Sequence, residues 1–353
     1  MKLKDIKLKK LIEILIITAA VSTMLLGLVV WIFNIPAYFR GEKGAYAMTP
    51  ENSISVNVNK TYEIEDITSI EVDLLFSDID VMVSDGDSVS FVYSGSAITK
   101  PEFKEPFLLF NKTLGKLSIK TTLKSSYSVA NSSIVLKLLL PENKIKELKL
   151  STSSGDITIF GNTSERLILN TSSGEIAVNG FTSSELYCDS SSGDQDFINL
   201  DIDILKLNSS SGKVTIDDSH SGKTEIETSS GDLNIHGFTS KDSKVETTSG
   251  RIQIEDYSGN LNLNSSSGSI YVVFGQEGDE IIADTSAGNV TLIFKKTAGF
   301  KIETDTSSGD FEIDFPLTLQ ENYNEDHMNG IVGDGIGLVK INTSSGDIKI
   351  IQK

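Results

Sequence analysis

The stretch Glu147-Leu-Lys-Leu-Ser-Thr-Ser-Ser-Gly-Asp-Ile-Thr-Ile-Phe160 decides the fold of this chain, because its central unit returns throughout the sequence. Ten copies of a Ser/Thr-Ser/Thr-Ser-Gly unit occur, and Ala287 is the one departure at the third place. Most successive glycines are 19 residues apart, and the last gap is 37. Such a period is typical of a solenoid, in which each repeat is one coil that cannot bury its apolar face alone. The glycines are Gly155, Gly174, Gly193, Gly212, Gly231, Gly250, Gly268, Gly288, Gly309 and Gly346.

Apolar residues alternate with polar ones on both sides of the glycine. Ile157 and Ile159 follow Gly155 at two and four residues, and Leu148 and Leu150 precede it at seven and five. This period-two alternation recurs in almost every repeat, and Gln195 is an exception. The pattern predicts two short strands per coil, joined by two turns. We therefore predict an all-β fold, a parallel β-helix or β-solenoid with coils of about 19 residues.

The glycine and the hydroxyl residues before it mark a corner of each coil. We expect these glycines to adopt a positive φ, which other residues tolerate poorly. We expect the Ser/Thr hydroxyls to bond the turn backbone and to stack as a ladder. A second corner follows six residues after the glycine, as at Gly161, Gly180 and Gly237. Asn-x-Ser/Thr triplets, as at Asn170 and Asn342, follow from asparagine preceding the ladder.

The N-terminus has a different composition. Five lysines precede an apolar stretch from Ile14 to Phe33, which is long enough to cross a bilayer as a helix. We predict a transmembrane signal-anchor helix over residues 11–35, with a cytoplasmic N-terminus and an ectodomain outside the plasma membrane. Cleavage after Ala47, in the small-x-small sequence Ala45-Tyr-Ala47, remains the alternative. The lysines are Lys2, Lys4, Lys7, Lys9 and Lys10.

Five segments follow from these patterns. We predict a basic cytoplasmic tail over 1–10, the membrane helix over 11–35, a linker over 36–51, an irregular β cap over 52–141 and the repeats over 142–353. Phe76-Ser-Asp-Ile-Asp-Val81, within the cap, resembles a degenerate repeat unit. A loop insertion at about 316–338 interrupts the repeats.

Charge narrows the range of partners. The chain has a net charge of −18, and the predicted export of residues 51–353 leaves −22 outside the membrane. This excludes nucleic acid and disfavours anionic lipid and anionic wall polymers. The negative charge of the ectodomain either serves only to keep it soluble or gives it a preference for cations or neutral glycans as ligands. Cys188 is the single cysteine, so no internal disulfide can form, and its repeat position predicts a buried small hydrophobe.

These features resemble a known family. The basic start with one span, the Leu-Leu-Leu-Pro-Glu junction at 138–142 and the repeated Thr-Ser-Ser-Gly-Asp-Ile units are similar to the bacterial membrane-anchored β-strand-repeat family named "putative adhesin". The resemblance covers residues 60–353. It implies a membrane-anchored envelope protein, and some such proteins are encoded beside envelope-stress signalling systems. The family has no established catalytic residues to carry over.

Two groups of acidic residues are candidates for metal binding. Most motif glycines are followed by a polar residue, often Asp as in Asp156, and a column of carboxylates could bind Ca²⁺. Lys213 and Arg251 interrupt this column, so a structural ladder is the favoured interpretation. The second group of calcium candidates is Asp326 and Asp334 near His327. We predict no metal site and no cofactor.

No pattern in the chain indicates catalysis. A nucleophile elbow, a P-loop and a zinc signature are all missing from the sequence. We therefore predict a non-enzymatic cell-envelope interaction or adhesion module. Its predicted partners are the membrane, through residues 11–35, and an envelope protein or glycan. The alternatives are an accessory component of envelope-stress sensing and a polysaccharide-active β-helix enzyme.

Overall fold

The computed structural model of the protein describes residues 52–100, 107–122, 128–130, 132–319 and 327–353. They belong to a compact unit that spans Glu51–Lys353. Among these described residues, the regular structure is β-strand apart from one short 3-10 helix, which confirms the all-β prediction. The predicted tail, membrane helix and linker lie outside the described residues. Within the described ranges, no helix is both long and apolar enough to span a bilayer.

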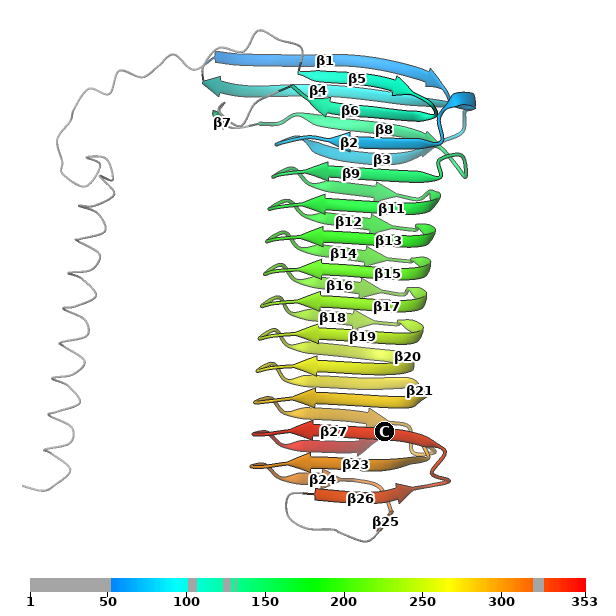
Figure 1. Cartoon of the computed structure of the whole chain (residues 1–353), viewed down its shortest axis with the longest axis vertical. Helices are drawn as coiled ribbons and strands as arrows, with labels where there is room; N and C mark the ends of the chain where they lie inside the picture. Colours follow the sequence, from blue (N-terminus) through cyan, green and yellow to red (C-terminus); the bar gives the residue numbers. More distant parts are fainter. Residues whose placement is uncertain (1–51, 101–106, 123–127, 131, 320–326) are drawn as a thin grey trace, which may run out of the picture. The chain divides into compact units, whose positions relative to one another are not determined.

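The strands fall into three groups along the chain (Figure 1). The N-terminal group comprises β1 (Asn52–Glu63), the 3-10 helix η2 (Ile64–Asp66), β2 (Ser69–Asp73), β3 (Asp78–Ser84), β4 (Ser88–Lys100), β5 (Leu108–Thr113), β6 (Lys116–Thr121), β7 (Ser128–Ala130) and β8 (Val135–Pro141). The regular coils comprise β9 (Glu147–Thr152), β10 (Ile157–Phe160), β11 (Thr163–Thr171), β12 (Ile176–Asn179), β13 (Thr182–Ser190), β14 (Gln195–Ile198), β15 (Asp201–Ser209), β16 (Val214–Asp217), β17 (His220–Thr228), β18 (Leu233–His236), β19 (Thr239–Thr247), β20 (Ile252–Ser265), β21 (Ile270–Thr285) and β22 (Val290–Phe294). The C-terminal group comprises β23 (Phe300–Thr306), β24 (Phe311–Ile313), β25 (Leu317–Leu319), β26 (His327–Val332), β27 (Gly337–Thr343) and β28 (Ile348–Gln352).

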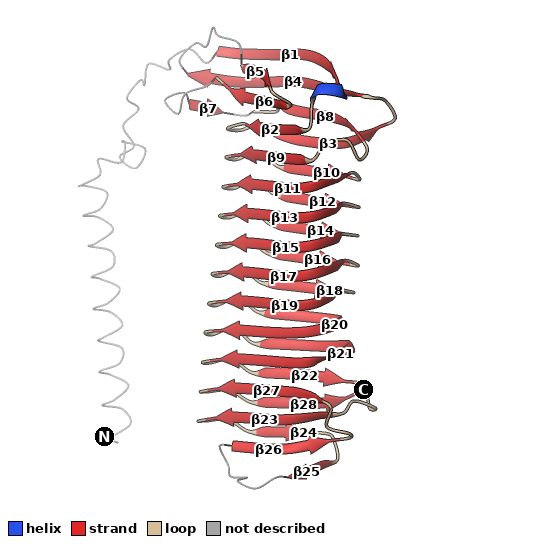
Figure 2. Ribbon diagram, turned by 45° about the vertical axis from the view of Figure 1, so that its right-hand side comes forward, coloured by secondary structure: helices blue, strands red, loops and turns tan. Residues whose placement is uncertain are grey.

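Equivalent strands of successive coils stack in parallel and form two layers (Figure 2). Strands that precede the motif glycine form one layer, beginning β9, β11, β13, and strands that follow it form the other, beginning β10, β12, β14. The register is the one that the repeat implies, with Leu148 opposite Leu167 and Ile157 opposite Ile176. The prediction of two strands per coil is confirmed.

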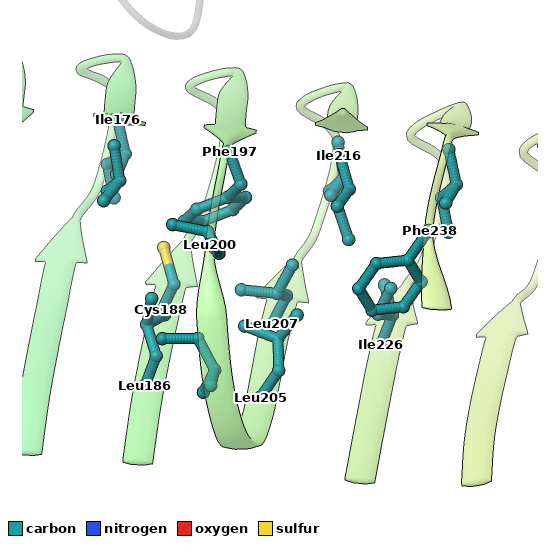
Figure 3. Packing of buried hydrophobic residues seen from close by; sticks show 14 of the residues in the cluster. Ile176, Leu186, Cys188, Phe197, Leu200, Leu205, Leu207, Ile216, Ile226 and Phe238 are labelled. Carbon is teal, nitrogen blue, oxygen red and sulfur yellow. The ribbon is translucent and has the colours of Figure 1, made fainter. Parts of the chain in front are cut away.

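The apolar residues of both layers meet in a narrow core between them (Figure 3). Leu148, Leu150, Ile157 and Ile159 are all buried, as the alternation predicts. Cys188 is also buried, which confirms the prediction of a small hydrophobe, and burial raises the pKa of its thiol.

Gln195 occupies a core position with a polar side chain. Its amide nitrogen donates to the backbone carbonyl of Asn208 at 2.7 Å, although the side chain is fully buried. That hydrogen bond satisfies the amide donor and limits the cost of burying it.

The first residue of each motif unit holds the corner together. The Thr152 hydroxyl accepts the Gly155 N–H at 3.1 Å, and the Thr228 hydroxyl accepts the Gly231 N–H at 3.0 Å. Ser190 and Ser209 also donate to the carbonyls of their own glycines. This residue is buried in every repeat, and in most repeats its hydroxyl is bonded within the turn or to a neighbouring coil, whereas the Thr285 hydroxyl has no partner among the described residues. The predicted hydroxyl ladder therefore centres on the residue three places before the glycine.

The predicted positive φ of the motif glycines is wrong. Positive φ occurs instead at the second corner, six residues later, in residues that tolerate the left-handed region. Those residues, with φ values between 46° and 71°, are Gly161, Gly180, Asn199, Asp218, Gly237 and Asp256.

The motif glycines are required by space rather than by φ. A Cβ on Gly174 would overlap the carbonyl oxygen of Gly155, and the same overlap recurs from coil to coil. A side chain of any size at this corner would push neighbouring coils apart. At the start of the column, Gly155 lies against the carbonyl of Ser77.

Ser77 shows that the stack begins before the recognisable repeats. β2 pairs with β9 and β3 pairs with β10, both in parallel, so residues 69–84 form a coil. The interpretation of Phe76–Val81 as a degenerate unit is confirmed. Beyond it, β8, β4 and β1 extend one layer, while the antiparallel hairpin of β5 and β6 extends the other.

The C-terminal coils stack in an order that differs from the order of the chain. β27 pairs with β21 on one side and with β23 on the other, and β28 lies likewise between β22 and β24. The last coil is therefore inserted between two earlier ones, as the red β27 in Figure 1 shows. The insertion predicted at 316–338 contains β25 and β26, and β26 pairs antiparallel with β23. The gap of 37 residues between Gly309 and Gly346 therefore reflects two features, the loop insertion at 316–338 and the return of the chain to place its last coil between two earlier ones.

Two glycine substitutions separate the steric requirement from the conformational one. Gly212→Ala should lower the free energy of unfolding by about 2–4 kcal/mol, because the methyl group meets the Gly193 carbonyl. Gly180→Asn should change it by no more than about 0.5 kcal/mol, because a Cβ there makes only an ordinary contact of 3.9 Å with Gly161 and Asn199 already adopts a similar positive φ. Urea denaturation of the full chain in detergent measures both. Equal effects of the two substitutions would contradict the steric explanation.

Candidate functional site

A shallow groove runs across successive coils on the layer that contains β13, β15 and β17. Its volume is about 1020 Å³, and its lining extends from Asp189 to the C-terminal strands β23, β26 and β27. The lining comes from the residues two, three and four places before each motif glycine, at the edge where the strands enter the corner. The groove therefore crosses the coils instead of lying within any one of them.

The outermost of these columns carries the chemistry of the groove. Because strand residues alternate, the residue four places before the glycine points outward, next to a buried apolar residue. The parallel register then places successive members about 4.8 Å apart. In stacking order, the members that line the groove are Asp189, Asn208, Glu227, Glu246, Asn264, Asp284, Asn342 and Asp305.

Carboxylates and amides share this column, and neither lysine nor arginine belongs to the groove lining among the described residues. Asn264 donates from its amide nitrogen to Glu246 at 3.2 Å, and Asn342 donates to Asp284 at 2.5 Å. Lys244 reaches Glu246 from a neighbouring column at 2.8 Å. These contacts relieve repulsion between coils and leave a surface rich in hydrogen-bond acceptors. Such a surface can accept hydrogen bonds from the hydroxyl or ammonium groups of a ligand.

The groove ends at a histidine. His327 Nδ1 lies 2.6 Å from a carboxylate oxygen of Asp305, which joins β26 to β23. The calcium hypothesis grouped His327 with Asp326 and Asp334. Asp334 instead accepts the Ile336 N–H at 3.2 Å within a turn, and Asp326 lies outside the described residues. Among the residues that the structure describes, no cluster of His, Cys, Asp or Glu could hold a metal ion.

The acidic residues after the motif glycines have a structural role. Asp156 accepts the backbone N–H of Glu175 in the next coil at 2.8 Å, and Asp232 accepts that of Arg251 at the same distance. Asn289 accepts the Asp347 N–H at 3.0 Å in the same way. Where Asp or Asn occupies this position, its side chain therefore ties one corner to the backbone of the next. Sequence reasoning favoured a structural ladder but attributed it to alternating charge.

The groove column itself was missed in the sequence. The signal was present, because Asn, Asp or Glu recurs four places before the glycine in nine of the ten repeats. Its asparagine members also form part of the Asn-x-Ser/Thr triplets. A periodic outward column is visible in a sequence once the inward positions have been assigned.

Comparisons with known proteins give a family match and several distant structural likenesses, three of which follow. A family model described as "Toastrack DUF4097" matches residues 67–244 and 222–351. No curated protein matches the chain significantly. A "putative adhesin" from Parabacteroides distasonis ATCC 8503 is 16% identical over 68% of this chain and 94% of its own, with a TM-score of 0.43. A "putative adhesin" from Parabacteroides merdae ATCC 43184 is 14% identical over 67% and 93%, with a TM-score of 0.35. A "putative cell adhesion protein" from Clostridium sporogenes ATCC 15579 is 15% identical over 85% and 100%, with a TM-score of 0.20.

The corner carboxylates can be tested for a role in calcium binding. Asp232→Ala should lower the free energy of unfolding by about 1 kcal/mol, because the Arg251 N–H loses its acceptor. Asp232→Asn should retain most of that stability, since Asn289 performs the same role. The urea midpoint of all three proteins should be the same with calcium and with chelator. A midpoint that calcium raises in the wild type and not in Asp232→Ala would refute the structural assignment.

Proposed function

The chain belongs to the Toastrack DUF4097 family, and from this premise we propose that it is a membrane-anchored, non-enzymatic interaction module of the cell envelope. Residues 11–35 anchor it to the plasma membrane, with the N-terminus in the cytoplasm and the solenoid outside. The polar groove along the coils binds an extended ligand, such as a glycan or a segment of an envelope protein.

The regularity of the groove is the observation that supports this proposal most strongly. Five carboxylates and three amides repeat along one line at the spacing of the coils. Equivalent acceptors at equal intervals suit a polymer whose own groups repeat, because each contact that forms raises the effective concentration for the next. A compact small molecule would use only part of such a surface.

The charge of the groove selects the class of ligand. With carboxylates in the lining and a net charge of −22 on residues 51–353, polyanions are repelled. Neutral polymers that offer hydroxyl groups, and cationic polymers, both match an acceptor-rich surface. The ligand is therefore a neutral glycan or a cationic chain.

The arrangement of the carboxylates supports a binding role over a catalytic one. A glycan-cleaving enzyme needs two carboxyl groups whose different environments separate their roles as acid and base. Here each carboxylate occupies the same position of a repeated coil, at the exposed edge of the layer. Apart from Asp305, which lies beside His327 at the end of the groove, and Glu246, which Lys244 contacts, the carboxylates of the column lie in the repeated surroundings of the coils.

Charge reversal in the groove tests the proposal. The full chain in detergent is applied to immobilised neutral wall glycan and to immobilised oligolysine, and both retention and released product are measured. Glu227→Lys/Glu246→Lys should weaken retention on the ligand that binds by roughly threefold to tenfold, because two acceptors of the groove become repulsive donors. The matched control, Asp217→Lys/Glu255→Lys, makes the same charge change on the other layer and should leave retention unchanged.

Three outcomes would contradict this proposal in different ways. Equal loss in the groove variant and in the control would mean that net charge alone governs retention. Release of a cleaved product would move the protein to the class of polysaccharide-active enzymes. Retention of neither ligand, together with a membrane protein that co-purifies through residues 11–35, would favour a role in envelope-stress sensing.

A further inference from the structure

The interior of the stack becomes polar between β17 and β19, in the layer that carries the groove. Seven places before the motif glycine, eight of the ten repeats have an apolar residue, and only Thr224 and Ser243 are polar. Both are buried, and the register places them opposite each other on adjacent strands. Leu186 and Leu205 occupy this place in the two preceding coils (Figure 3). The change therefore affects one contact in the middle of the stack.

Two buried serines lie beside this pair. Ser221 and Ser240 are fully buried, and they too pair across β17 and β19. The Thr224 and Ser240 hydroxyls are 3.1 Å apart, whereas the Ser243 hydroxyl has no hydrogen bond of normal geometry in the described part of the chain. Hydrogen bonds between buried hydroxyls add little net stability compared with the apolar burial that leucine provides at the same place. The contact between β17 and β19 is thus weaker than the equivalent contacts of the preceding coils.

A column of aromatic residues also ends at this contact. Successive ring contacts run through the later coils from Phe238 to Phe315, with centroids 4.7–6.3 Å apart. Such contacts bind neighbouring coils to one another. The Thr239 N–H donates to the Ser219 carbonyl at 3.1 Å, which places Ser219 at the position of Phe238 one coil earlier. The aromatic column therefore stops where the layer becomes polar.

Two glutamates face each other across the same pair of strands. Glu227 and Glu246 are opposite in register, and they are the only two carboxylates at successive places in the groove column of the described residues. Like charges directly opposite on neighbouring strands are destabilising. Lys244 lies 2.8 Å from Glu246 and offsets part of the repulsion. The groove thus crosses the weak contact at the point where its own charges repel each other.

The other layer stays apolar at this level. Leu233 and Ile235 on β18 are buried opposite Ile252 and Ile254 on β20. Because each coil of a solenoid contacts only its neighbours, the stability of the stack is a sum of local contributions. A weak contact then opens locally while the remainder stays folded. The weakness is confined to the layer that carries the groove.

We propose that β17 and β19 separate transiently in the folded protein and that a ligand in the groove holds them together. A ligand group that is cationic or donates hydrogen bonds bridges Glu227 and Glu246, which relieves their repulsion and stabilises the closed contact. Binding is therefore coupled to the stability of the middle coils. The opening is independent of the proposed function, whereas its suppression by a ligand rests on it.

Amide hydrogen exchange of the full chain in detergent, followed by mass spectrometry, tests the opening without a ligand. The amides of β17 and β19 should exchange at least about tenfold faster than those of β13 and β15. Thr224→Val/Ser243→Ala removes both hydroxyls with little change in size, and it should slow the exchange of β17 and β19 at least about threefold. Glu227→Gln/Glu246→Gln removes the repulsion and should also slow it.

The matched control places the same polar pair in another contact. Leu186→Thr/Leu205→Ser should make β13 and β15 exchange faster and leave the exchange of β17 and β19 unchanged, since Leu186 and Leu205 are opposite in register. Equal exchange of the four strands in the wild type would overturn the opening. An unchanged rate in Thr224→Val/Ser243→Ala would overturn its assignment to the buried hydroxyls.

The coupling to the groove is tested by repeating the exchange with oligolysine and with the neutral wall glycan. The ligand that is retained should slow β17 and β19 at least about threefold, and more than it slows β13 and β15. Retention of a ligand without this slowing would overturn the coupling and leave groove binding intact. Retention of neither ligand, with β17 and β19 still exchanging fastest, would overturn the proposed function and the coupling but not the opening.

Discussion

The close approach of one motif glycine to the carbonyl of the next is the contact on which the rest of the structure depends. It lets neighbouring coils come within hydrogen-bonding distance at their tightest corner, where any Cβ would collide with backbone. Once the corner closes, the hydroxyl three residues earlier can bond the glycine N–H, and the carboxylate one residue later can bond the next coil. The serine-rich motif thus combines three contributions: a glycine that leaves space for the next coil, a hydroxyl that bonds the turn, and a carboxylate that bonds the next coil.

The same contact explains how the C-terminal end is assembled. Gly346 lies against the carbonyl of Gly288, and Gly309 lies against that of Gly346. The contact between coils therefore does not depend on their being consecutive in the chain. This is why the last coil of the chain can sit between two earlier coils and still continue both layers and the groove. The lining of the groove likewise follows the stacking order of the coils and not their order in the chain.

The sequence was informative where burial dictates residue type. The alternation of apolar and polar residues predicted both strands of each coil and the burial of Cys188. The weak similarity of Phe76–Val81 to the repeat unit predicted the coil that contains Ser77. The role of the motif glycines was misjudged because glycine is needed either for positive φ or for space, and one sequence does not separate the two. The inserted coil was missed because a gap of 37 residues looks the same whether it is a loop or a change of stacking order.

The candidate site was harder to predict than the fold. Outward residues are under no packing constraint, so their column of Asn, Asp and Glu gave no apolar pattern to follow. The calcium candidates were chosen because they lie close together in sequence, whereas the structure pairs His327 with Asp305 from another strand. The predicted membrane helix and Asp326 fall outside the described residues and remain predictions.

Cysteine crosslinking at the corners tests the central claim, that glycine contacts set the stacking order, most directly. In this account Asn289 and Asp347 are neighbours, because the Asp347 N–H bonds Asn289, while Asp310 lies one coil further along. Asn289→Cys/Asp347→Cys should form a disulfide on mild oxidation. Asn289→Cys/Asp310→Cys should not, because two coils separate the sites by about 10 Å, beyond the reach of a disulfide. A disulfide in the 289–310 pair and none in the 289–347 pair would show that the coils stack in chain order and would contradict the account.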